Sequence, residues 1–219
     1  MTSRLQRLAR RTAASDPAAR SGDDAEARCD LCSAPIGPEH RHLLELPSHL
    51  LRCACRACTV VLGAVGAGGG RYRLIPERYR ELPALAGDDA RWADLRLPVS
   101  LAFLVRRESG DGLAVFPGAL GPTDAPIDAE RWAALESAYP EVKEMESEVE
   151  AVLVNRLQGK RECWLVPLDE CYRLVALLRA RWEGINGGRA VWIEIDRFFA
   201  QIASRVAGAP TRDAQEMPG

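Results

Sequence analysis

The sequence lacks the apolar segments that membrane proteins need. Its 219 residues contain no run approaching about 18 consecutive apolar side chains, and the N-terminal stretch has no apolar core of the kind found in signal peptides. The net charge of −2 argues against a protein that coats nucleic acid or a membrane. These absences predict a globular, cytoplasmic protein without membrane contact. In that reducing compartment, clustered cysteines favour metal coordination over disulfides.

Residue types and motifs of catalysis are scarce as well. The chain has three histidines, and all of them lie between residues 40 and 49. It contains no HExxH motif and no Ser-His-Asp order, and no Lys-Ser or Lys-Thr pair follows the glycines at 66 and 68–70, which excludes a P-loop. The sequence therefore favours a protein that is not an enzyme, with no catalytic residues and no organic cofactor.

What the chain does have is a concentration of metal-binding side chains between Cys29 and Cys58. Five of the seven cysteines lie there, and four of them form two CxxC pairs, Cys29 with Cys32 and Cys55 with Cys58. This spacing is typical of two knuckles that a short β-ribbon brings together. Four thiolates at the corners of a tetrahedron bind zinc at about 2.3 Å and leave no position open to water. We therefore predict a structural zinc site at these four residues.

Two features leave the ligand set open. Cys53 adds a third thiol to the second group, although only two are needed to match the first pair. The CxxC geometry favours Cys55 and Cys58 as ligands and leaves Cys53 as a spare or neighbouring thiol. A histidine could also replace one thiolate, although the surface of the ribbon is the expected place for all three: His40, His42 and His49.

Two other functions are compatible with the same stretch. The four sulfurs could hold iron as in rubredoxin and carry one electron, but rubredoxin knuckles usually continue with glycine. Here Ser33 and Thr59 follow the two pairs, which favours zinc. The segment from Arg52 to Arg80 has six arginines and two tyrosines against Glu77 alone, a composition that could bind nucleic acid. In an arginine-rich chain such a patch more often faces solvent or a protein partner, so nucleic acid is the weaker alternative.

The pattern of apolar residues predicts an α+β fold. Alternating apolar residues on either side of turn residues indicate two antiparallel hairpins, over 99–116 and 149–166. Helical spacing and capping residues indicate about three helices, one capped by Asp128, one capped by Asp169 and one over 191–206. The predicted segments are a disordered arm (1–27), a zinc-ribbon-like module (28–65), a linker with short helices (66–97), an α+β domain (98–207) and a disordered tail (208–219).

Several stretches of the chain carry a resemblance to a known family. They are CDLC with PIGPEHRHLLEL, LLRCACRAC, YRLIPERY, LPVSLAFLV, ECWLVPLDECYRLVALLRARWEGINGG and VWIEIDRFF, which together cover most of residues 28–200. The chain resembles an uncharacterised, largely actinobacterial domain-of-unknown-function family (5947). The family has no established activity, but its members are often encoded near nickel–iron hydrogenase genes. The resemblance thus implies an accessory part in assembling or supplying that enzyme. Together with the cysteines, it leads us to expect a zinc-binding accessory or adaptor protein whose protein partner is a hydrogenase subunit or maturation factor.

Overall fold

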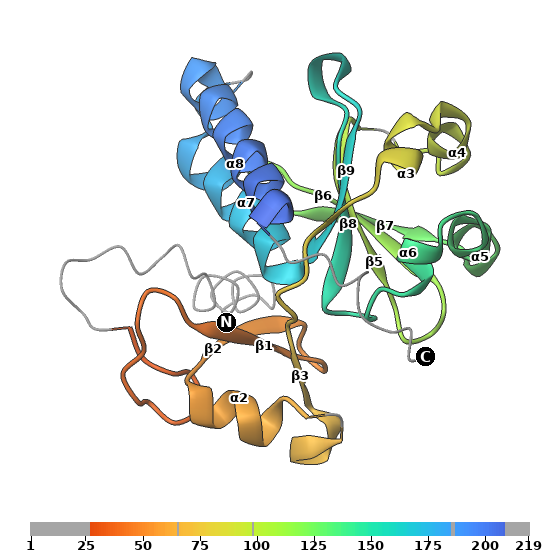
Figure 1. Cartoon of the computed structure of the whole chain (residues 1–219). Coiled ribbons are helices and arrows are strands. Elements are labelled where there is room, and N and C mark those ends of the chain that lie inside the picture. The colour runs from red at the N-terminus through yellow and green to blue at the C-terminus, as the bar shows by residue number, and fades with distance from the viewer. Residues whose placement is uncertain (1–26, 65, 98, 185–186, 209–219) are drawn as a thin grey trace, which may run out of the picture.

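The computed structural model describes residues 27–64, 66–97, 99–184 and 187–208 of the chain. The predicted disordered arm and tail lie outside these ranges, apart from residues 27 and 208. Two antiparallel sheets, one of three strands and one of six, organise the described part (Figure 1). The antiparallel sheets and the accompanying helices confirm the predicted α+β class.

The smaller sheet and one helix form what we call the N-terminal module, residues 27–75. Its first two strands make a hairpin in which His42 lies opposite Cys53, and its third strand pairs with the free edge of the first. The helix follows the second strand after a single residue. Its elements are β1 (Arg41–Glu45), β2 (Leu50–Ala54), α2 (Arg56–Leu62), the 3-10 helix η2 (Ala67–Gly70) and β3 (Tyr72–Leu74).

The larger sheet is the centre of what we call the larger domain, residues 80–208. Its strands are β4 (Arg80–Glu81), β5 (Leu101–Arg106), β6 (Gly112–Phe116), β7 (Thr123–Ile127), β8 (Glu150–Asn155) and β9 (Glu162–Pro167). They are arranged in the order β4-β9-β8-β5-β6-β7, and every neighbouring pair is antiparallel. Both predicted hairpins are confirmed, as β5–β6 and as β8–β9, with the 3-10 helix η3 (Leu157–Gly159) in the second turn.

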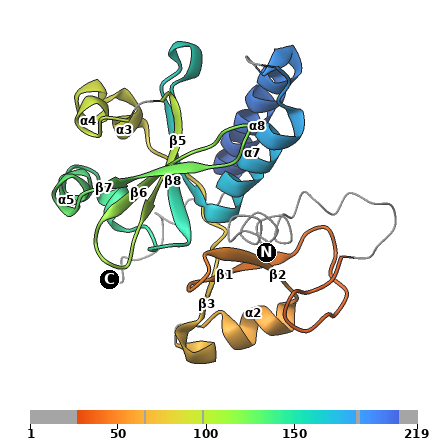
Figure 2. The ribbon, with the colours of Figure 1, turned by 180° about the vertical axis from the view of Figure 1, so that it is seen from behind.

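Helices cover both faces of the larger sheet, as the two opposite views show (Figures 1 and 2). One face carries α7 (Leu168–Arg181) and α8 (Gly188–Gly208), and the other carries α3 (Pro83–Gly87), α4 (Asp89–Asp94), α5 (Ala129–Ala138) and α6 (Pro140–Lys143). Successive strand residues point to opposite faces, so Phe103 packs in the first core and Leu104 in the second. Of the described helices, none is long and apolar enough to cross a membrane.

The prediction of about three helices was wrong, because the described part of the chain contains seven α-helices. Four of them, α2, α3, α4 and α6, are four to seven residues long; α3 and α4 lie in the segment 66–97 for which short helices are predicted, and α2 and α6 are additional. One or two turns are too short for the spacing of apolar residues to show a period. The predicted cap at Asp169 was also wrong. The helix begins at Leu168, and Asp169 lies in its first turn.

The N-terminal module and the larger domain share one apolar core. Leu44 of β1 and Ile75 after β3 are buried in the same cluster as Phe103, Leu153 and Trp164 of the larger sheet. Residues 66–97, for which a linker with short helices is predicted, contain α3 and α4 and also give one strand to each sheet. The segment that connects the two parts is therefore itself folded, with β3 in the smaller sheet and β4 in the larger one.

Candidate metal centre

The first CxxC pair lies in a tight turn ahead of the hairpin. The N–H of Ser33 donates to the carbonyl of Cys29 at 2.9 Å, and the N–H of Cys29 donates to the carbonyl of Ala34 at 2.8 Å. Ser33 adopts a positive φ of 62°, a left-handed conformation that glycine favours. The chain therefore makes the knuckle turn here with serine in the position where rubredoxin usually has glycine.

The second CxxC pair opens a helix. Cys55 is the residue before α2 and Cys58 lies in its first turn, where the N–H of Thr59 donates to the carbonyl of Cys55 at 3.0 Å. A β-ribbon, the hairpin β1–β2, does connect the two pairs, as the spacing predicts. The second pair differs from a β-knuckle in that its two side chains project from one helical turn.

The four predicted cysteines come together in one group. The sulfurs of Cys29, Cys32, Cys55 and Cys58 all lie within 4.8 Å of one another, and those of Cys32 and Cys55 are 3.6 Å apart. Four sulfurs around a zinc ion at bonds of about 2.3 Å are separated by about 3.8 Å, which this spacing approaches. The group could therefore hold a metal ion in a closed tetrathiolate cage.

The electrostatics of the group call for a cation. Burial opposes the ionisation of Cys29, but backbone N–H groups, that of Cys55 foremost, lower its pKa to about 6. Burial and the thiols around it raise the pKa of Cys58 to about 12. Ionising the four thiols together would place like charges side by side, and a divalent cation among the sulfurs would offset them.

Cys53 and the histidines do not join this group. Cys53, His40 and His42 form a second group, whose potential ligand atoms also lie within 4.8 Å of one another. His49 lies on the exposed turn of the hairpin, with its ring 3.7 Å from the Glu148 carboxylate. Reasoning from the sequence missed this second group, although the signal was present: two histidines at positions i and i+2 next to β2 share one face of the hairpin with the residue opposite.

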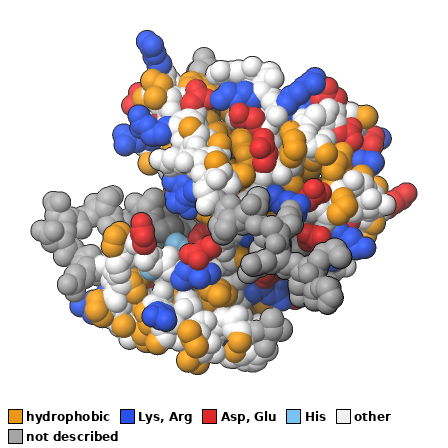
Figure 3. Space-filling view, viewed as in Figure 1, with side chains coloured by type: hydrophobic (Ala, Val, Ile, Leu, Met, Phe, Trp, Pro, Cys, Tyr) orange, Lys and Arg blue, Asp and Glu red, His pale blue; other side chains and the backbone are white. Residues whose placement is uncertain are grey.

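The arginine-rich segment is used for contacts within the chain. Five of its six arginines form ion pairs: Arg52 and Arg71 with Glu45, Arg73 with Glu108, Arg78 with Glu150, and Arg80 with Glu141 and Glu144. In the space-filling view, basic and acidic side chains are interspersed on the visible face (Figure 3). This pairing neutralises the charge that a nucleic-acid backbone would need, so it counts against the nucleic-acid alternative.

Residues 28–206 match the model of a family of unknown function, DUF5947, and the chain belongs to this family. The match covers both the N-terminal module and the larger domain. No curated protein and no solved structure shows a detectable similarity to the chain.

Proposed function

We propose that Cys29, Cys32, Cys55 and Cys58 hold a structural zinc ion and that the chain is a non-catalytic accessory or adaptor protein. The convergence of the four sulfurs within 4.8 Å carries this proposal. A tetrathiolate cage has no open position for substrate, so its role is to fix the turn at the N-terminal end of the module to the start of α2. Iron in the same cage, with a role in electron transfer, is the alternative.

Metal analysis of the full chain as purified separates zinc from iron, because a ferric tetrathiolate is red and zinc is colourless. We expect zinc, and we expect the variant Cys29→Ser/Cys32→Ser to lose one equivalent of it. The control is Cys163→Ala, which removes a buried thiol of β9 that lies in the apolar core of the larger domain. If the purified protein contains iron and absorbs visible light, the electron-transfer alternative replaces the structural zinc site. An unchanged metal content in Cys29→Ser/Cys32→Ser would reject the four-cysteine site.

The adaptor role needs a surface for a protein partner, and α2 offers one. None of its residues is buried, and Val60 and Val61 are 71% and 66% exposed. Apolar side chains this exposed beside a rigid metal site are suited to contact another protein. A hydrogenase subunit or maturation factor, the partner implied by the resemblance, stays a prediction. Co-purification of such a subunit with the tagged chain from its native host, lost in Val60→Ser/Val61→Ser, tests it. Retention of the subunit by that variant would exclude α2 as the contact.

A further inference from the structure

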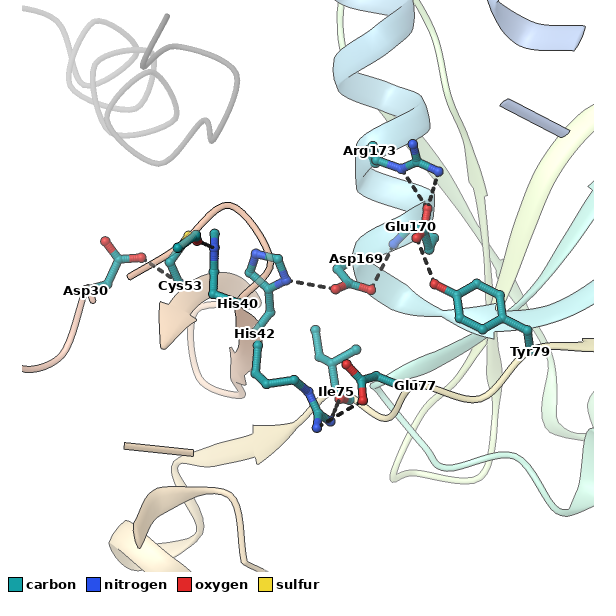
Figure 4. Close-up of polar contacts among 12 residues, drawn as sticks. Asp30, His40, His42, Cys53, Ile75, Glu77, Tyr79, Asp169, Glu170 and Arg173 are labelled. Carbon is teal, nitrogen blue, oxygen red and sulfur yellow. Dashed lines mark hydrogen bonds and ion pairs between the residues drawn. The ribbon is translucent and has the colours of Figure 1, made fainter. Parts of the chain in front are cut away.

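A group of three potential metal ligands lies on the side of the N-terminal module that faces Asp169 in the first turn of α7 (Figure 4). It shares no residue with the four-cysteine group. His42 on β1 and Cys53 on β2 are directly opposite each other in the hairpin. His40 precedes His42 by two residues, and the two rings contact edge to face with centroids 4.8 Å apart. The hairpin therefore brings the ligand atoms of two imidazoles and one thiol within 4.8 Å of one another.

We propose that His40, His42 and Cys53 form a second metal site that binds a divalent cation of the zinc type. The ligand atoms are Nε2 of each histidine and Sγ of the cysteine. Nitrogen and sulfur ligands in this mixture suit zinc, which takes three protein ligands where a coordination position is kept open. The site shares no ligand with the four-cysteine cage, and it is an addition to the proposed function that does not depend on it.

The orientation of both imidazole rings supports this assignment. Nδ1 of His42 donates to Oδ2 of Asp169 at 2.8 Å, and Nδ1 of His40 lies 2.9 Å from the carbonyl oxygen of Gly37. Metal-binding histidines commonly donate their second ring N–H to a carboxylate or a backbone carbonyl, which fixes the ring and leaves the other nitrogen for the metal. Since Nδ1 is engaged in both rings, Nε2 is the nitrogen that each ring can offer to a metal, and the His42 imidazole also hydrogen-bonds the proposed third ligand, Cys53.

A hydrogen-bonded cluster without a metal explains less of what is there. Asp169, His42 and Cys53 could share protons in a line, but Nε2 of His40 is buried and has no hydrogen-bond partner among the described residues. A buried polar atom without a partner is destabilising, because it has lost its hydrogen bonds to water and gained none in the protein. A metal ion at the point where the three ligand atoms meet would satisfy this nitrogen together with the other two.

The histidine side of the site borders a cavity of about 890 Å³ between β1 and α7. Its wall includes His40, His42 and Asp169, and it continues to Tyr79 and Glu170, whose side chains are hydrogen-bonded to each other at 2.8 Å. Three protein ligands leave one position of a tetrahedral ion free, and here that position would take water or a small donor molecule from the cavity. This distinguishes the second site from the closed cage of four thiolates.

The two metal sites are tied to each other through the backbone. Asp30, which lies between Cys29 and Cys32, accepts from the N–H of Cys53 at 2.8 Å through its carboxylate. The N–H of Asp30 in turn donates to the carbonyl of Cys53 at 2.8 Å. The first knuckle therefore holds the strand that presents Cys53, and filling the cage should help to form the second site.

Zinc titration of the metal-stripped full chain against a chromophoric chelator tests the proposal. We expect two equivalents for the wild type and one for His40→Ala/His42→Ala. The matched control is His49→Ala, because His49 is the remaining histidine and lies outside both groups; it should keep two equivalents. Asp169→Asn should keep both sites but weaken the second by about 10- to 100-fold, since Asp169 acts as a positioning residue for His42. Equal zinc content in the wild type and in His40→Ala/His42→Ala would overturn the proposal.

X-ray absorption at the zinc edge of the wild-type protein provides a measurement that needs no variant. We expect nitrogen scatterers beside sulfur in the first coordination shell, because the second site adds two imidazoles. A shell made of sulfur alone at full zinc loading would show that the cage is the only site and would reject the proposal. In Cys29→Ser/Cys32→Ser, which lacks the four-cysteine cage, zinc that still has nitrogen ligands would show that the second site binds metal without the cage.

Discussion

The N-terminal module and the larger domain are stabilised in different ways. The larger sheet is covered on both faces, and its two cores bury large side chains such as Trp132, Phe103 and Phe198 almost completely. The module has one small sheet, and its helix α2 has no buried residue. Its buried apolar residues are Leu43, Leu44, Ala54 and Ile75, besides Cys29.

This difference shows how a short segment can keep a fixed structure. A segment of about 50 residues buries too little apolar surface to fold well alone and usually needs a metal, a disulfide or a larger partner. The module has the apolar support of the larger domain through Leu44 and Ile75, the ion pairs of the buried Glu45 carboxylate with two partly exposed arginines, and the cysteine group. The larger domain has two apolar cores, and a domain of its size can fold without a metal or a disulfide.

Removing the proposed zinc ion should have the largest effect on the N-terminal module, since metal binding contributes on the order of 10 kcal/mol in isolated zinc modules. With a strong chelator, or in Cys29→Ser/Cys32→Ser, we expect the backbone amides of β1, β2 and α2 to lose protection from hydrogen exchange. The amides of β5 and β8, in the middle of the larger sheet, should keep theirs. Exchange measured by mass spectrometry before and after chelation checks both halves of this prediction.

Two results would contradict it. If β5 and β8 lost protection as fully as α2, the two parts would be one cooperative unit. If no segment changed, the cysteine group would not stabilise the module at all. Restoring zinc after chelation is the control for reversibility.

Truncating a side chain in the core under α5 should destabilise the larger domain and leave the metal content of the N-terminal module unchanged. Trp132 is fully buried and donates to Glu136 at 2.8 Å, so Trp132→Ala should cost about 3–5 kcal/mol of the free energy of unfolding. Gly112 lies under the same ring: a Cβ there would come within 2.2 Å of it, so Gly112→Ala should also destabilise the domain. Gly87→Ala, with open space around its Cβ, is the matched control. Denaturant unfolding measures the loss, and zinc content should stay unchanged.

Those parts of the fold that repeat over many residues could be predicted from the sequence. The two hairpins were confirmed because alternation over five or six residues and a turn between them specify both strands. The cap at Asp128 was confirmed as well, since its carboxylate accepts from the N–H of Arg131 at 2.9 Å. Local chemistry alone decides these features.

Features that depend on contacts across the chain could not be predicted in the same way. Asp169 looks like a capping residue in sequence, but its carboxylate is used by His42, which is 127 positions away. The grouping of Cys53 with the histidines requires the register of β1 on β2, which the turn between them sets. The CxxC spacing is enough to predict a four-cysteine group from the sequence. A group of histidines and a cysteine can be recognised only when the pairing of the hairpin is known.

Glu45 offers a smaller effect that depends on pH. It is 3% exposed, and hydrogen bonds from Arg52, with Arg71 and Ser48, lower its pKa to about 2 although burial opposes this. A lowered pKa stabilises the fold above the ordinary value of about 4.5, and this contribution is lost as the pH falls toward 2. The shift corresponds to at most about 3 kcal/mol, because the side chain of Arg71 is exposed and solvent screens the pair.

Urea unfolding of the wild type and of Glu45→Gln at a series of pH values measures this contribution. The difference between the two proteins should be constant above about pH 4.5 and should narrow below it. Acid also protonates the thiolates, so each comparison is made at one pH. A difference that does not change with pH would mean that the Glu45 carboxylate keeps its ordinary pKa in the folded protein.

The smallest effect concerns the larger domain alone. Asp128→Ala removes the cap of α5 and should cost about 1 kcal/mol, because one N–H at the start of the helix loses its acceptor. Asp128→Asn keeps an acceptor at the same position and should restore most of the loss. Since α5 packs on the face of the sheet away from α7, neither variant should alter the exchange of the N-terminal module or its zinc content. A loss of zinc in Asp128→Ala would show that the two parts are coupled through the sheet, and the separation between a metal-supported module and a self-sufficient domain would then fail.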